Sequence, residues 1–256
     1  MSLRCIALGT ALLAASLCPP AVTHAGFEAG FARADITPTE PVRLSGYGNR
    51  DHAHEGVDHP LYVRATALKA DDGPVHILVA VDTIGFPGVL TKEIFETLRQ
   101  SIDLERRHLV IAGTHSHTAP HIDQGLSNLF AAPLSADERE NGKRYTRRVH
   151  DTVVEVVKQA IANLAPARLF YGVGEATFAQ NRRRQDGPVD HTLPLLRITD
   201  ETGKTTRGLL FNYACHCTTF GGDYYRVNGD WAGYAAQMLE ASFPDAVALC
   251  TIGCGA

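Results

Sequence analysis

The segment Val75–Val81 (VHILVAV) constrains the fold most, because it is apolar on both of the faces that alternate along a strand. Such a run is typical of a strand in the middle of a sheet that is covered on both sides. His108–Gly113 (HLVIAG) has the same character. Two strands of this kind need cover above and below, so the chain is expected to fold in layers.

Three helices are expected from apolar residues that recur every three or four positions. The first is short and begins at Thr91, whose hydroxyl can cap it. The second covers Tyr145–Leu164 and is stopped by Pro166. Asp230 is expected to cap the third. All three have an apolar side that can cover a sheet.

Further strands are expected at Ala167–Phe178, Leu195–Thr199, Arg207–Cys215 and Val247–Ile252. Because strands and helices alternate, we predict an α/β fold with mixed β-sheets layered with helices. The chain has no internal repeat and no low-complexity linker, so one domain is expected over residues 26–256. The sequence stops directly after a strand that looks buried, which favours an incomplete domain of a longer protein.

The amino-terminal residues have the pattern of an export signal. A basic residue precedes the apolar stretch Ile6–Leu17, and small residues precede a cleavage site near Ala25. We therefore predict a signal peptide over residues 1–25 and a secreted or periplasmic protein. A membrane anchor is disfavoured because the stretch is shorter than the roughly 20 residues that span a bilayer. No later segment is long and apolar enough to be transmembrane.

The charge of the chain excludes one large class of partners. A formal net charge of -4 gives no general attraction to nucleic acid, which calls for a basic face. A small-molecule or lipid substrate is expected instead. The oligomeric state cannot be predicted from these residues.

The mature chain would keep four cysteines. Cys215 and Cys217 are expected on the same side of a strand, so each reaches Cys250 or Cys254 more readily than it reaches the other. An oxidising compartment permits disulfides, and both buried thiols and one structural bridge remain open. Zinc ligation by these thiols is disfavoured because the spacing is not that of paired zinc knuckles.

The densest group of side chains that can bind a metal is Gly113–His121 (GTHSHTAPH), at the end of a predicted strand. His115 and His117 are separated by one residue, so in an extended chain both imidazoles point to the same side and can reach one ion. His216 ends another apolar strand. A catalytic zinc needs ligands that converge from separate strands, with one position left open for water. The pattern therefore predicts a metal site at these strand ends.

Five segments carry a family resemblance when they are taken together and in order. They are Gly30–Pro38 (GFARADITP) with Leu44–Gly48 (LSGYG), Thr114–His117 (THSH), Asn181-Arg182, Asn212–His216 (NYACH) and Gly229–Tyr234 (GDWAGY). In this order they resemble the neutral/alkaline non-lysosomal ceramidase family. The matches run from Gly30 to about Gly255, so the resemblance covers nearly all of the mature chain. The chain is thus similar to the amino-terminal part of that family's catalytic domain.

The resemblance implies a function and a role for each site residue. It implies that His115 and His216 bind Zn²⁺, that His117 lies beside the metal and contacts the substrate, and that Arg182 holds the substrate or its developing negative charge. Family members use the zinc to activate a water that attacks the amide carbon of an N-acyl-sphingoid base. The resemblance thus implies a zinc-dependent amidohydrolase of ceramide-like lipids, with a lipid-like N-acyl amide as partner and peripheral contact with membrane lipid.

The sequence also departs from the family. The family completes its zinc site with a Glu and a Tyr from a later region, and places an important Ser shortly after the segment that matches Thr251–Ala256. This sequence ends first. We therefore expect weak metal binding and little activity from this chain alone. Cys217 stands where the family commonly has Pro, which is expected to alter the turn after His216.

Two rival interpretations of the function stay open. The chain could be another His-x-His metallohydrolase, although Ala119 and Pro120 stand where metallo-β-lactamase-like proteins have Asp and His. It could also be a catalytically silent, secreted binding protein that keeps the fold and recognises acyl or glycan groups.

Three other groups of residues are conspicuous. Asp82 follows a buried strand and is expected either to orient a metal ligand or to begin a turn. In the run Arg182–Arg184, two of the three side chains are expected to be solvated. A further set of residues looks like a second metal cluster: Asp51, His52, His54, Asp58 and His59. Their spacing in a loop flanked by Gly and Asn favours an exposed segment instead, and a role at the cleft mouth is the alternative.

Overall fold

The computed structural model describes residues 26–125 and 129–255. The predicted signal peptide, residues 1–25, lies outside the described residues. The strands are β1 (Phe27–Asp35), β2 (Gly56–Val57), β3 (Tyr62–Ala70), β4 (His76–Val81), β5 (Leu109–Gly113), β6 (Ala165–Glu175), β7 (Thr192–Asp200), β8 (Thr206–Tyr213), β9 (Arg226–Val227) and β10 (Val247–Ile252). The α-helices are α1 (Gly88–Leu98), α2 (Ala136–Ala162) and α3 (Asp230–Ser242).

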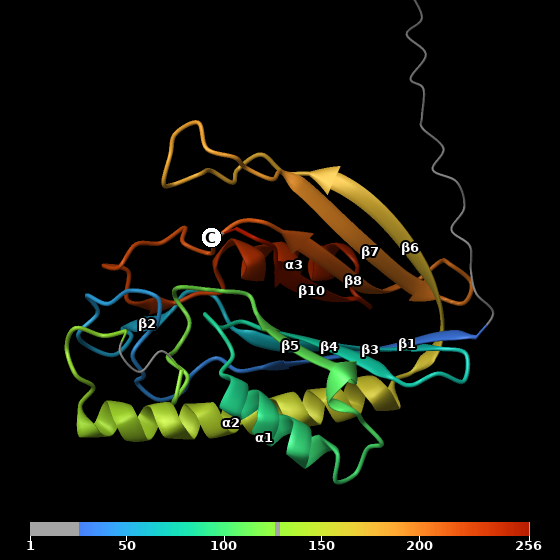
Figure 1. The fold of residues 1–256 in the computed structure, drawn as a ribbon, viewed down its shortest axis with the longest axis horizontal. Helices are drawn as coiled ribbons and strands as arrows, with labels where there is room; N and C mark the ends of the chain where they lie inside the picture. Colours follow the sequence, from blue (N-terminus) through green and yellow to red (C-terminus); the bar gives the residue numbers. More distant parts are fainter. Residues whose placement is uncertain (1–25, 126–128, 256) are drawn as a thin grey trace, which may run out of the picture.

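Eight strands form one mixed sheet in the order β10-β8-β7-β6-β1-β3-β4-β5. Two pairs are parallel, β4 with β5 and β8 with β10, and the others are antiparallel. The pair β1 and β6 is held at only Glu28↔Pro166 and Ala29↔Ala165. The sheet bends at this short contact into two halves, which Figure 1 shows as separate layers. The predicted α/β fold of mixed sheet and helices is confirmed.

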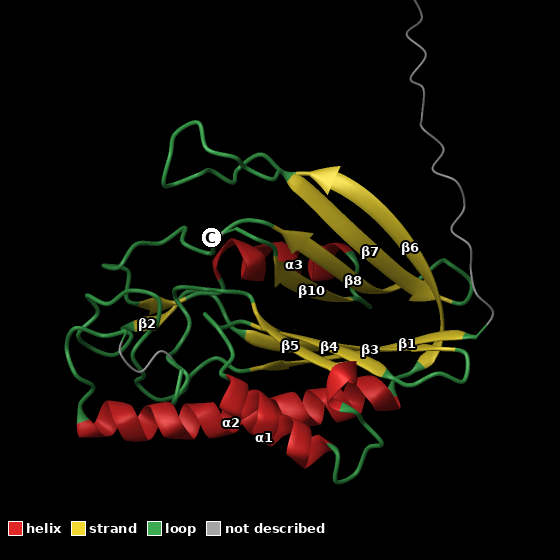
Figure 2. Cartoon of the chain, viewed as in Figure 1, coloured by secondary structure: helices red, strands yellow, loops and turns green. Residues whose placement is uncertain are grey.

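The two halves pack face to face through an apolar cluster that lies between them. α1 and α2 cover the outer face of the first half, β1, β3, β4 and β5 (Figure 2). The inner face contributes Phe31 of β1, which packs with Ile198 of β7 and Leu249 of β10. The outer face of β8 and β10 packs against Ala232 and Ala236 of α3. The resulting order is helices, half-sheet, half-sheet, helix.

The boundaries of α1 and α2 differ from those expected in three places. α1 begins at Gly88, so Thr91 lies inside the helix and its hydroxyl donates to the Pro87 carbonyl. α2 begins at Ala136 rather than Tyr145, because Ser135 and Glu138 form a capping box before a charged first turn. It ends at Ala162, and Pro166 lies within β6.

The start of α3 differs in a way that bears on the site. Asp230 is the first residue of the helix, and Gly229 occupies the cap position without a side-chain cap. The prediction of Asp230 as the cap was therefore wrong. Its carboxylate accepts hydrogen bonds from the Thr219 hydroxyl and from the Thr219 amide in the loop after β8.

The four cysteines of the described chain are free thiols. Cys215 lies beyond the end of β8, while Cys217 and Cys250 are buried against α3. Burial raises the pKa of both buried thiols, which keeps them neutral. The interpretation with buried thiols therefore describes these two residues. No helix among the described residues is long and apolar enough to cross a membrane.

Candidate metal centre

Three histidines meet where the two halves of the sheet come together. His115 and His117 follow β5 in the first half, and His216 follows β8 in the second. The two segments are joined by a parallel bridge between Ser116 and Cys217, in which the His117 amide donates to the Cys217 carbonyl over 3.2 Å. Residues about a hundred positions apart in the chain are thus adjacent.

The Nε2 atoms of the three imidazoles converge on one point. His216 Nε2 lies 2.9 Å from Nε2 of His115 and 2.9 Å from Nε2 of His117, and the remaining pair is 3.4 Å apart. Ligands of a tetrahedral zinc at about 2.0–2.1 Å are about 3.3 Å from one another, so the spacing fits one small ion. Among residues 26–125 and 129–255 this is the one group of three or more His, Cys, Asp or Glu side chains that could hold a metal.

Hydrogen bonds at Nδ1 aim two of these rings. His115 Nδ1 donates to the Ile84 carbonyl over 2.5 Å, and His216 Nδ1 donates to the Gly255 carbonyl over 3.3 Å. A proton held at Nδ1 leaves the Nε2 lone pair free for a metal. His117 Nδ1 is buried without a partner in the described structure. The rings are therefore aimed by the backbone of the strand ends.

The environment favours neutral imidazoles. Burial, together with the neighbouring His115 and His216, lowers the pKa of His117 to about 4. Burial and His115 likewise lower the pKa of His216. Both rings are neutral at pH 7, which is the form that binds a metal.

Residues outside the histidine segments hold His117 in place. Gly46 has a φ of 99°, and a Cβ on it would lie 2.6 Å from the His117 side chain. The Tyr47 ring meets the His117 ring edge-on with centroids 5.1 Å apart. The buried Arg50 guanidinium donates to the His117 carbonyl over 2.6 Å. Gly46 and Tyr47 lie in the LSGYG segment, but no sequence signal identified Arg50.

A cavity of about 360 Å³ opens beside His216. Phe178 and Trp231 form part of its wall, and Arg182 lies on its lining. Arg182, Arg183 and Arg184 are all exposed, so one more arginine of this run is solvated than expected. The structure thus brings Arg182 to the same pocket as His216, without a hydrogen bond between them among the described contacts.

Asp82 is buried, and its hydrogen bonds among the described residues reach none of the three imidazoles. Its Oδ1 accepts from the Thr114 hydroxyl over 3.2 Å, and its Oδ2 accepts from the Tyr62 amide and from Arg64. It holds the residue before His115 rather than the ring itself.

The loop around His52 forms no second metal site among the described residues. His52 is exposed and pairs with Asp51 and Glu55. His59 is 2% exposed and bonds Gln237 on α3. The expectation of an exposed segment holds for Asp51, His52 and Asp58, but His54 is half-buried and His59 is buried.

Comparison with known proteins identifies one family. The family described as "Neutral/alkaline non-lysosomal ceramidase, N-terminal" matches residues 27–249. Neutral ceramidase of Drosophila melanogaster is 27% identical over 240 residues, which cover 87% of this chain and 33% of that protein. Neutral ceramidase of Mycobacterium tuberculosis is 27% identical over 229 residues, covering 81% and 34%. The chain thus spans about a third of the length of these relatives.

The fold has a match among solved structures. The crystal structure of neutral ceramidase from Pseudomonas aeruginosa superposes with a TM-score of 0.75 and 20% sequence identity, over 89% of this chain and 38% of that chain. At this identity the likeness concerns the fold.

Proposed function

The chain belongs to the neutral/alkaline non-lysosomal ceramidase family, and on that premise we propose that residues 26–256 form the amino-terminal part of a zinc-dependent amidohydrolase. Its substrates are ceramide-like lipids, whose N-acyl amide bond is cleaved to a fatty acid and a sphingoid base. The observation that carries the proposal is the convergence of the Nε2 atoms of His115, His117 and His216 within 3.4 Å of one another.

In this proposal His115 and His216 hold Zn²⁺ through Nε2. Zinc supplies a bound water of pKa about 7 and polarises the carbonyl of the substrate. Three imidazoles form a tighter site than the two expected from the sequence, and the spacing makes His117 available as a third donor. If a residue from elsewhere completes the metal shell, the same Nε2 can instead bind the substrate.

Arg182 is proposed to meet the negative charge that develops on the carbonyl oxygen. Its side chain lines the cavity beside His216, and a guanidinium carries its charge at any working pH. Phe178 and Val189 also line that cavity, and both are exposed large apolar residues that suit an acyl chain or peripheral contact with membrane lipid. Export through the signal peptide over residues 1–25 is part of the proposal.

The first experiment measures zinc content and hydrolysis of a fluorogenic N-acyl-sphingosine. It uses the chain and a version extended through any downstream reading frame. We expect about one zinc per chain, lost in His115→Ala and His216→Ala and kept in His52→Ala, which removes an exposed histidine outside the cluster. Hydrolysis is expected from the extended form.

Each alternative has its own outcome. Zinc binding without hydrolysis of the lipid amide by either form would favour another metallohydrolase. If neither form binds zinc, the metal site is refuted and the silent binding protein takes its place.

A further inference from the structure

Helix α3 carries two buried carboxylates near its opposite ends. Asp230 begins the helix and is 0% exposed, while Glu240 lies in its last turn and is 7% exposed. At about 1.5 Å per residue, the ten positions between them span roughly 15 Å. Buried carboxylates need partners, and the partners of these two lie on different segments of the site.

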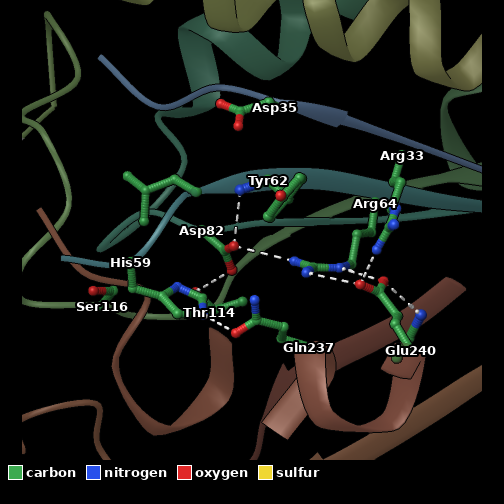
Figure 3. A network of polar contacts seen from close by, with 12 residues as sticks. Arg33, Asp35, His59, Tyr62, Arg64, Asp82, Thr114, Ser116, Gln237 and Glu240 are labelled. Atoms are coloured by element: carbon green, nitrogen blue, oxygen red, sulfur yellow. Dashed lines mark hydrogen bonds and ion pairs between the residues drawn. The ribbon is translucent and has the colours of Figure 1, made fainter. Parts of the chain in front are cut away.

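The Glu240 end leads to His115. Glu240 Oε1 accepts from Arg64 Nε over 2.9 Å, and Arg64 Nη1 donates to Asp82 Oδ2 over 3.1 Å. Asp82 Oδ1 in turn accepts from the Thr114 hydroxyl. Figure 3 shows this line of side chains, which crosses from α3 through β3 to the strand end before His115. Burial opposes the charge of Arg64, but Asp82 and Glu240 outweigh it and raise the pKa of Arg64.

The residues after Asp82 form the support on which His115 rests. The His115 amide donates to the Thr83 carbonyl over 2.9 Å, and the ring donates to the Ile84 carbonyl over 2.5 Å. His115 has a φ of 62°, which is uncommon for a residue with a side chain. This conformation has to be held by its surroundings, and segment 82–84 provides three of the contacts of Thr114 and His115.

The Asp230 end leads to His216. Asp230 accepts from the Thr219 hydroxyl over 2.6 Å and from the Thr219 amide over 3.0 Å. The next residue, Trp231, donates from Nε1 to the His216 carbonyl over 3.3 Å. The start of α3 thus holds the loop that carries His216.

We propose that α3 fixes the position of the two histidine segments relative to each other, with Glu240 and Asp230 as positioning residues. This inference rests on the proposed metal function, and it adds residues that touch neither metal nor substrate. Loss of either link shifts one of the two histidine segments while the other stays in place. Outer partners of metal ligands alter affinity about 10–100-fold when they are lost.

The test measures Co²⁺ affinity and the visible spectrum of the Co²⁺ complex, together with hydrogen exchange of the metal-free chain. Glu240→Gln is expected to weaken Co²⁺ binding about tenfold, to change the spectrum and to raise exchange at 113–117. Thr219→Val is likewise expected to weaken Co²⁺ binding and to change the spectrum, but with hydrogen exchange raised at 216–219. Thr219→Ser keeps the hydroxyl, so its Co²⁺ affinity, spectrum and exchange should be close to those of the unaltered chain.

Glu138→Gln is the matched control for lost stability. Glu138 pairs with the buried Arg43 from α2, and its hydrogen bonds reach neither histidine segment. We expect it to leave Co²⁺ affinity within twofold. If Glu240→Gln lowers the melting temperature but leaves affinity, spectrum and local exchange like those of Glu138→Gln, the positioning role is refuted. If the unaltered chain binds no Co²⁺, the proposed metal function fails. The positioning role of α3 is then tested by hydrogen exchange at 113–117 and 216–219 alone.

Discussion

The two halves of the sheet are packed very differently. The first half and its helices enclose the largest apolar cluster, in which Ile94 and Leu98 of α1 and Val79 of β4 are fully buried. The second half has a smaller cluster under α3, and its β6 strand leaves Tyr171 and Val173 60% and 58% exposed. The first half thus has a large buried core, whereas the second half is a curved layer that is only partly covered.

The metal centre combines the two kinds of support. His117 belongs to the first half and is 8% exposed, while His216 belongs to the second and is only partly buried. The first half supplies two imidazoles, of which His115 is partly buried like His216, and the second brings in the third through a loop and α3. The position of His216 should respond more easily to changes at a distance.

The largest expected effect is a cavity in the first half. Ile94→Ala removes a fully buried side chain and should cost about 2–5 kcal/mol of the free energy of unfolding. Val173→Ala in the second half should stay within about 0.5 kcal/mol because the side chain is exposed. Denaturant unfolding measures both, and equal losses would show that the halves are equally packed.

The contact between the halves is tested by Gly208→Ala. A Cβ on Gly208 of β8 would lie 2.0 Å from the Phe31 ring of β1, so the halves must move apart at a cost of about 1–3 kcal/mol. Gly172→Ala in β6 is the control, since nothing lies within 4 Å of its Cβ. The free energy of unfolding of Gly208→Ala, measured by chemical denaturation, should be partly restored when Phe31→Leu is added to the same chain. Without that rescue, the predicted clash is not the cause.

A smaller effect is expected at the glycine beside His117. Gly46→Ala places a Cβ against the imidazole at a φ of 99°, which should cost about 1 kcal/mol and weaken zinc binding. Gly221→Ala, in the loop after His216, has open space around its Cβ and should leave zinc binding unchanged. Titration against a chromogenic chelator compares the two. Equal zinc affinities would mean that His117 is not a donor in this chain.

The sequence predicted the strands that show their burial in their composition. Val75–Val81 contains β4, whose Ile77, Val79 and Val81 are buried as expected. His108–Gly113 contains β5, but the expectation of a covered strand in the middle of the sheet was wrong there, because β5 lies at the edge of the sheet and Val110 is 54% exposed. β1 and β3 had no such pattern, since they pack through small residues and carry the buried polar groups Arg64 and Thr66. The first turns of α2 are charged on most sides, so periodicity did not reveal them.

The site was predictable where its residues are close in sequence or belong to a family motif. His115 and His117 form a doublet, and the resemblance linked them to His216. The link from Glu240 to Arg64 joins residues 176 positions apart, and neither residue looks special in its own segment. Such a contact depends on the bend of the sheet, which no local pattern encodes.

The smallest expected effect concerns the pH dependence of the metal-free chain. The pKa of His117 is about 4 in the folded chain and about 6.5 in an unfolded one, so between these values the folded state binds fewer protons. Its contribution to stability is therefore complete above about pH 6.5 and is lost as the pH falls toward 4. The lowered pKa of His216 acts in the same direction.

Thermal unfolding is measured between pH 6.5 and 5, above the range of the carboxylates. The stability of the unaltered chain should fall over this range as the pH falls, and that of His117→Gln should fall less steeply. His52→Gln is the opposing control, because hydrogen bonds to Asp51 and Glu55 raise the pKa of His52 in its exposed loop, so that its small contribution is present at low pH and is lost as the pH rises. An unchanged slope in His117→Gln would mean that the ring is not held neutral by burial, and the contrast between the two halves would then not extend to their histidines.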